Sequence, residues 1–169
     1  MLARFHESAE RGRPVEAQST AAAVQARWDA NIAELQRFVG TVIDRQRFEA
    51  VERLAGRFIA GRALLFAGRV HVGRIVDGHG DLLADDIFCL PNGPEILDCL
   101  EFDDNLRCVD TIDDAAFLAM DLEFLGRKDL GEFFLAQYSQ LAADPAPLPT
   151  SAARGLDHAD NRIPRYLFP

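Results

Sequence analysis

The 169-residue sequence has one lysine, one tryptophan and three cysteines. The cysteines, Cys89, Cys99 and Cys108, are odd in number and lack CxxC spacing, so they are expected to be reduced core residues of a cytoplasmic protein. The longest unbroken apolar run, Ala115–Met120, is far shorter than the ~20 residues of a membrane-spanning helix, which predicts no membrane contact. Charged residues among the first ten leave no room for the apolar core of an export signal.

Negative charge is concentrated in one part of the chain. Residues 1–76 contain twelve arginines and eight acidic residues, whereas residues 77–123 contain fourteen acidic residues and only Arg107 as a basic one. Residues 124–169 hold five charges of each sign, which leaves a net charge of −9. Such an acidic block argues against nucleic-acid binding. It suits a divalent cation instead, because hard ions such as Mg²⁺ prefer carboxylate oxygens.

Hydrophobic periodicity predicts a mainly helical chain. The expected helices run over residues 1–10, from Ser19 or Thr20 to Gly40, from Asp44 to Gly61, from Thr111 or Asp113 to about Leu125, and from Leu130 to Leu141. Residues 11–18 between the first two helices are expected to form a loop. Trp28 falls on the apolar stripe of the second helix, and Phe58 falls on that of the third. Both side chains are therefore predicted to face the core.

The region between the helices has a β-like pattern. Two short runs, Ile87–Leu90 and Glu95–Leu100, are separated by Pro91–Pro94, which predicts a β-hairpin. The fold class is therefore α+β. We expect one domain over residues 1–142, followed by a proline-rich, poorly ordered tail over residues 143–169.

Several polar residues fit an ordinary structural role. Three histidines lack ligand-like spacing and are expected at the surface or in packing contacts: His6, His71 and His158. Four acidic residues are expected to cap or decorate a helix: Asp110, Asp113, Asp114 and Asp121.

The residues that point to chemistry lie around one short loop. His79-Gly80-Asp81 is followed five residues later by Asp86, and the second predicted strand carries Asp98. Such a loop can hold one carboxylate beside an incoming hydroxyl, while the hairpin presents two further oxygen ligands. Phosphoryl transfer needs those parts: an Asp beside the nucleophilic hydroxyl, and oxygen ligands for the metal ions that bridge the phosphates.

His79-Gly80-Asp81-Leu82 resembles the HGD catalytic loop of the aminoglycoside phosphotransferase family, in the protein-kinase-like superfamily. Ile96-Leu97-Asp98-Cys99-Leu100-Glu101-Phe102 resembles its metal-binding strand. The sequence over residues 1–146 is similar to a subgroup of bacterial proteins in which this domain precedes a P-loop ATP-binding domain. The resemblance implies a kinase-like C-terminal lobe with a small β-hairpin, which uses Mg²⁺ and ATP to phosphorylate a small-molecule hydroxyl.

The same resemblance implies a role for each matching residue. Asp81 corresponds to the catalytic base, and Asp98 to the Asp that binds Mg²⁺ between the nucleotide phosphates. Asp86 stands where the family has Asn or His as its second metal ligand, a departure that still offers an anionic oxygen. His79 is expected to brace the loop through hydrogen bonds.

The family's N-terminal lobe has no equivalent in this sequence. No G-x-G-x-x-G or Walker A pattern occurs, and Lys128 follows the catalytic loop, so it cannot be the upstream phosphate anchor. We therefore expect a truncated or frameshifted gene product whose exposed lobe-docking surface promotes self-association.

The residues also allow plainer interpretations. Asp85 and Asp86 can be turn formers, Asp98 can be an edge-strand charge, and the acids after it can form a solvated face. Two alternative functions follow. One is a non-catalytic remnant or interaction module that has lost nucleotide binding. The other is a metal-dependent phosphoesterase that uses Asp81, Asp86 and Asp98 without a nucleotide, although no histidine ligand supports it.

Overall fold

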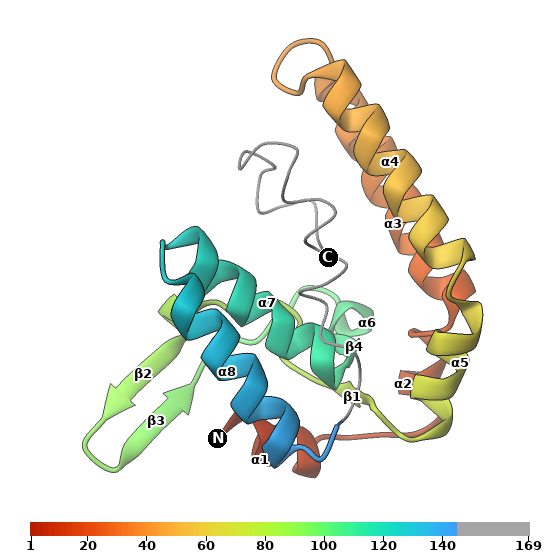
Figure 1. Cartoon of the computed structure of the whole chain (residues 1–169). Helices are drawn as coiled ribbons and strands as arrows, with labels where there is room; N and C mark the ends of the chain where they lie inside the picture. Colours follow the sequence, from red (N-terminus) through yellow and green to blue (C-terminus); the bar gives the residue numbers. More distant parts are fainter. Residues whose placement is uncertain (145–169) are drawn as a thin grey trace.

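Two antiparallel helices, α7 (Thr111–Phe124) and α8 (Lys128–Leu141), form the centre of the computed structural model, which describes residues 1–144 (Figure 1). The Asp110 carboxylate caps α7 by accepting a hydrogen bond from the Ile112 amide at 3.1 Å. The cap is therefore Asp110, one of the four acids expected to cap or decorate a helix, and not Thr111 or Asp113. The chain turns at Gly126, as the sequence predicts, and α8 then returns along α7.

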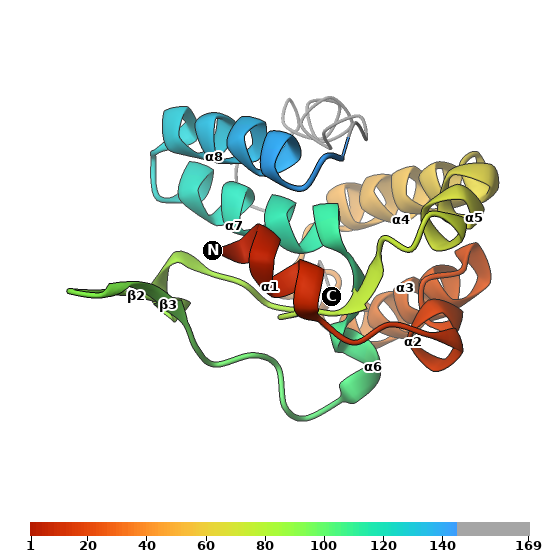
Figure 2. The ribbon, with the colours of Figure 1, turned by 90° about the horizontal axis from the view of Figure 1, so that it is seen from below.

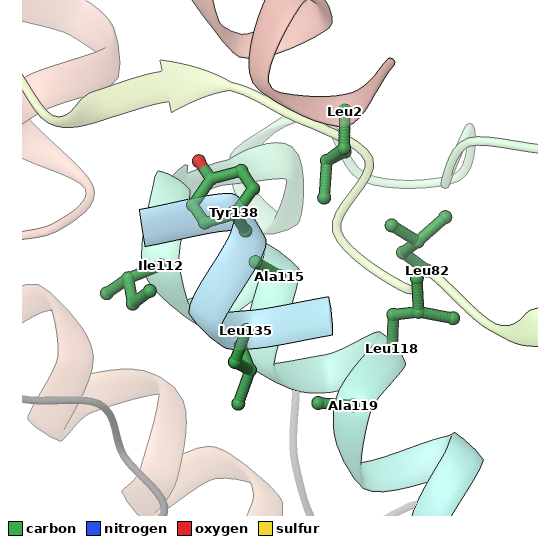
Figure 3. Close-up of a cluster of buried hydrophobic side chains, with 8 residues drawn as sticks. All are labelled: Leu2, Leu82, Ile112, Ala115, Leu118, Ala119, Leu135 and Tyr138. Atoms are coloured by element: carbon green, nitrogen blue, oxygen red, sulfur yellow. The ribbon is translucent and has the colours of Figure 1, made fainter. Parts of the chain in front are cut away.

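The main core lies between these helices and the short N-terminal helix α1 (Leu2–Ser8), which runs beneath them (Figure 2). Apolar side chains from α1, α7, α8 and the loop after β1 meet there (Figure 3): Leu2, Leu82, Ile112, Ala115, Leu118, Ala119, Leu135 and Tyr138. Burial of these side chains removes apolar surface from water and stabilises the three helices together.

Two small antiparallel sheets complete an α+β fold that is mainly helical, as predicted. One sheet pairs β1 (Ile75–Asp77) with β4 (Cys108–Asp110), a strand that the sequence pattern did not predict. The other is the predicted hairpin of β2 (Ile87–Leu90) and β3 (Gly93–Ile96). The second strand ends at Ile96 instead of continuing to Leu100. The prediction that Asp98 lies on this strand is therefore wrong.

Two long helices, α3 (Ala21–Leu35) and α4 (Arg45–Ala60), pack side by side as an arm on the opposite side of the body from the hairpin (Figure 1). The side chains of Thr20 and Asp44 cap them, as predicted. The α3 helix ends at Leu35 and buries none of its residues, and Phe58 of α4 is 37% exposed. The prediction that Trp28 and Phe58 face the core is therefore wrong: Trp28 is half-buried, and neither side chain belongs to a buried cluster of the described residues.

Short elements connect these larger parts. They are α2 (Arg13–Ala17), the 3-10 turn η1 (Gln36–Phe38), α5 (Ala63–His71), the 3-10 turn η2 (Ala84–Asp86) and α6 (Asp104–Arg107). The α2 helix occupies the predicted loop because Pro14 stands in its first turn, where a missing amide hydrogen costs nothing. Within residues 1–144, no helix has the length and apolar character needed to cross a membrane.

One buried arginine joins three elements. Arg69 of α5 donates two hydrogen bonds to Asp110 at 2.5 and 2.6 Å and two to Asp144 at 2.6 Å. Arg74 supports the same corner by donating to the carbonyls of Ala142 and Ala143. Asp144, the second residue of the predicted tail, is 2% exposed and packs against the body, whereas Ala143 before it is exposed. Residues 145–169 lie outside the described part of the chain.

We predict that Arg69→Met lowers the free energy of unfolding by about 3–5 kcal/mol, because it removes the cation that pairs with the buried Asp110 carboxylate and leaves Asp144 with the more distant Arg74, whose Nε lies 3.8 Å from Asp144 Oδ2. Chemical denaturation of the full chain measures this change. The matched control is Arg127→Met, which removes an exposed arginine paired with Asp129 and is expected to leave the denaturation midpoint unchanged. Equal midpoints for both variants would contradict the proposed contribution of Arg69.

Candidate functional site

The loop after β1 is anchored by the carboxylate of Asp114, which lies on α7. Asp114 of α7, whose side chain is 1% exposed, accepts hydrogen bonds from the backbone amides of His79 at 2.8 Å and Gly80 at 3.1 Å. The preceding amide, that of Gly78, donates to the carbonyl of Arg107 at 2.8 Å. Three successive amides of the loop are thus fixed, and Asp81 follows directly after them.

The two glycines of this loop are required by close packing. A Cβ atom at Gly78 would lie 2.8 Å from an Asp114 carboxylate oxygen and 2.7 Å from a methyl group of Val109. Gly80 has a φ of +84°, and a Cβ there would lie 3.0 Å from the Leu106 carbonyl oxygen. Any side chain would push the loop away from α7 and α6, so the Gly-His-Gly sequence is what allows the anchoring.

His79 connects the loop to the segment after the hairpin. Its imidazole Nε2 lies 2.9 Å from the carbonyl oxygen of Leu97, and its own carbonyl accepts from the Leu100 amide at 3.1 Å. His79 is 1% exposed, and its Nδ1 is buried without a hydrogen-bond partner among the described residues. Because a carbonyl can only accept, Nε2 carries the hydrogen of this contact. These contacts join the loop to residues 97–100, and the bracing role of His79 stays a prediction.

Asp98 lies between the two residues that contact His79. It is exposed, and its backbone has a φ of +62°, a left-handed conformation that Asp adopts more readily than most residues. The Leu97 amide donates to the backbone carbonyl of Asp86 at 3.0 Å, so Asp86 lies beside the same segment. The fold therefore places Asp81, Asp86 and Asp98 on three neighbouring stretches of backbone, although Asp98 does not lie on a strand.

The carboxyl group of Asp81 differs from an ordinary surface acid. The residue is exposed as a whole, yet partial burial of the carboxyl group and the neighbouring Asp86 raise the pKa of Asp81 above its usual range. Asp86 itself accepts a hydrogen bond from the Leu83 amide at 2.7 Å through one oxygen. A carboxylate with a raised pKa is a better proton acceptor, which suits Asp81 to general-base chemistry.

The structure contains no preformed cage for a metal. Within residues 1–144, no group of three or more His, Cys, Asp or Glu side chains is arranged to hold a metal ion. A site made by Asp86 and Asp98 would have only two protein ligands, so this finding does not test it. Their role as Mg²⁺ ligands stays a prediction. Their oxygen donors are the type that Mg²⁺ prefers.

Sequence reasoning missed the residues that support the loop. It assigned Asp114 to helix capping or decoration and His6 to the surface or to packing. Both residues are buried, so the packing alternative holds for His6, but the contact between His6 and Asp114 was not predicted. A signal was present: the run Ala115–Met120 indicates a helix that is apolar on most sides. An Asp at the start of such a helix is buried and needs hydrogen-bond donors.

Comparisons with known proteins give relatives without an established activity. The chain is 54% identical over 147 residues to an uncharacterized protein of Mycobacterium tuberculosis and to one of Mycobacterium bovis. The match covers 87% of this chain but only 30% of each relative, so the chain spans less than a third of their length. No protein-family description and no solved structure matches the chain.

We predict that Gly80→Ala destabilises the loop more than the positive φ alone explains. Gly40 has a similar φ of +87° with nothing within 4 Å of a Cβ, so Gly40→Ala isolates the backbone strain, about 1–2 kcal/mol. Gly80→Ala adds the clash with the Leu106 carbonyl, for a further loss of roughly 1–3 kcal/mol. Thermal and denaturant unfolding of both variants measures the difference, and equal losses would contradict the close approach.

Proposed function

We propose that this chain is a kinase-like phosphotransferase domain that takes part in phosphoryl transfer from Mg²⁺·ATP to a small-molecule hydroxyl. The observation that carries the proposal is the anchored loop: Asp114 fixes the amides of His79 and Gly80, and an exposed Asp81 with a raised pKa follows them. A general base needs this combination of a fixed position, access to solvent and affinity for a proton.

Each group of the chain would have one task. The Asp81 carboxylate accepts a hydrogen bond from the substrate hydroxyl and takes up its proton. His79 keeps the segment that carries Asp98 next to the loop through the Leu97 carbonyl. Within the described residues, neither Asp81 nor Asp98 forms an ion pair with a basic side chain. Both therefore remain able to bind a substrate or a cation.

The donor set fits the metal better than the nucleotide. Asp86 and Asp98 offer carboxylate oxygens suited to Mg²⁺. When bound, Mg²⁺·ATP would supply the phosphoryl group and the positive charge that stabilises it in transfer. The lysine that anchors phosphates in the resembling family has no counterpart among residues 1–144, since Lys128 pairs with Glu123 at 3.3 Å on the α7–α8 turn. We also propose, as part of the same hypothesis, that a longer protein containing this domain carries out the phosphoryl transfer.

A second candidate is the interaction module, and the hairpin favours it. Phe88, Leu90 and Leu97 are 47%, 43% and 50% exposed, and two strands alone are marginally stable in water. These apolar side chains form a surface that another protein segment could cover. This candidate predicts a folded chain that associates with a partner or with itself and does not bind Mg²⁺·ATP.

For the phosphotransferase we predict that Asp81→Asn lowers the rate of ADP release by about 10²–10⁴-fold, because the amide cannot accept the proton. Release is measured with Mg²⁺·ATP and a panel of hydroxyl-bearing small molecules, and nucleotide binding should be unchanged. Asp85→Asn is the matched control, because Asp85 is exposed near the same loop and has no assigned role.

Two outcomes would contradict the phosphotransferase proposal. Equal ADP release by Asp81→Asn and by the unmodified chain would show that Asp81 is not the base. A folded chain that neither binds Mg²⁺·ATP nor releases ADP would favour the interaction module.

A further inference from the structure

The Asp114 carboxylate has a third hydrogen-bond donor, which comes from the far end of the chain. The imidazole Nε2 of His6 lies 2.9 Å from Asp114 Oδ2, the oxygen that also accepts from the His79 amide. The side chains of His6 and Asp114 are only 3% and 1% exposed. Two neutral amides and one imidazole therefore satisfy a carboxylate that water does not reach.

His6 is held in this position by its own helix and by α8. It stands four residues after Leu2, so both side chains lie on the same face of α1, and Leu2 packs into the main core. The other ring nitrogen, Nδ1, lies 2.7 Å from the hydroxyl of Tyr138. Contacts at both nitrogens fix the plane of the ring as well as its position.

The hydrogen-bond partners Asp114 and Tyr138 determine which nitrogens of the His6 ring carry a hydrogen. A carboxylate only accepts, so His6 Nε2 carries a hydrogen. The Tyr138 hydroxyl can donate to a neutral Nδ1 or accept from a protonated one, and burial raises the pKa of Tyr138 to about 12, which keeps the hydroxyl protonated. The chain Tyr138–His6–Asp114 is therefore satisfied in both states of the imidazole.

We propose that His6 is a positioning residue of the candidate site: it holds Asp114 in the orientation that fixes the His79 and Gly80 amides, and through them Asp81. The effect of His6 on catalysis rests on the proposed function. The coupling of α1 to the loop stands on the contacts alone. Without His6, the buried carboxylate would keep only two neutral donors and would be drawn toward water, away from the loop.

Amide hydrogen exchange in the full chain tests the coupling without any assay of activity. His6→Phe keeps a ring of similar shape but removes both hydrogen bonds. We expect the His79 and Gly80 amides to exchange at least about tenfold faster in this variant, while the amides of α7 and α8 keep their rates. His6→Gln is the conservative control, since its side-chain amide can still donate to Asp114 and should restore slow exchange.

The outcomes separate a positioning role from a merely structural one. Unchanged exchange at His79 and Gly80 in His6→Phe would overturn the proposal, and so would equal acceleration throughout the protein. If His6→Phe does not fold, Tyr138→Phe takes its place. This variant removes only the partner of Nδ1 and should accelerate exchange at the same two amides by a smaller factor, and no change at either amide would overturn the proposal.

ADP release then distinguishes this inference from the proposed function. If the phosphotransferase proposal holds, His6→Phe lowers the turnover number more than it changes the Michaelis constant for Mg²⁺·ATP, and His6→Gln recovers most of it. If Asp81→Asn has no effect on ADP release, the proposed function fails. A local change in amide exchange in His6→Phe would still establish the contact between α1 and the loop.

Discussion

A carboxylate that is withdrawn from water must be surrounded by donors, and Asp114 meets this requirement by drawing three distant parts of the chain together. The loop after β1 supplies two amides, α1 supplies an imidazole, and α7 supplies the carboxylate itself. The loop could not approach without Gly78 and Gly80, because a Cβ at either position would meet atoms of α7, β4 or α6. The shape of the candidate site thus follows from the satisfaction of one buried charge.

Some of the remaining acids of the segment 77–123 are paired with arginines. Asp110 is paired with Arg69, and Asp77 with Arg107, which also donates to the Leu100 carbonyl. These pairs join secondary-structure elements and contribute to the fold. Asp81 and Asp98 lie at the surface of the same region without a cationic partner in the described part of the chain. Their carboxylates are therefore accessible to a ligand, a property that they share with other exposed acids of the segment such as Asp85.

The sequence allowed prediction of features whose cause is local. Helix caps at Thr20 and Asp44, the turn at Gly126 and the hairpin around Pro91–Pro94 depend on neighbouring residues only. The pairing of β1 with β4 depends on two three-residue strands about thirty positions apart, which are too short to give a periodic signal. The contact between His6 and Asp114 spans 108 positions, and no local pattern encodes it. The position of Asp98 was missed because β3 ends at Ile96, whereas its apolar pattern suggests a strand that continues to Leu100.

We propose that the anchored loop and the segment 97–100 form a site for a metal-bound nucleotide. Calorimetric titration of Mg²⁺·ATP into the purified chain tests this proposal, with Asp98→Asn as the comparison. We expect saturable binding that the substitution abolishes while the circular dichroism spectrum stays the same. An absence of binding to the folded, unmodified chain, or equal binding by both proteins, would contradict it.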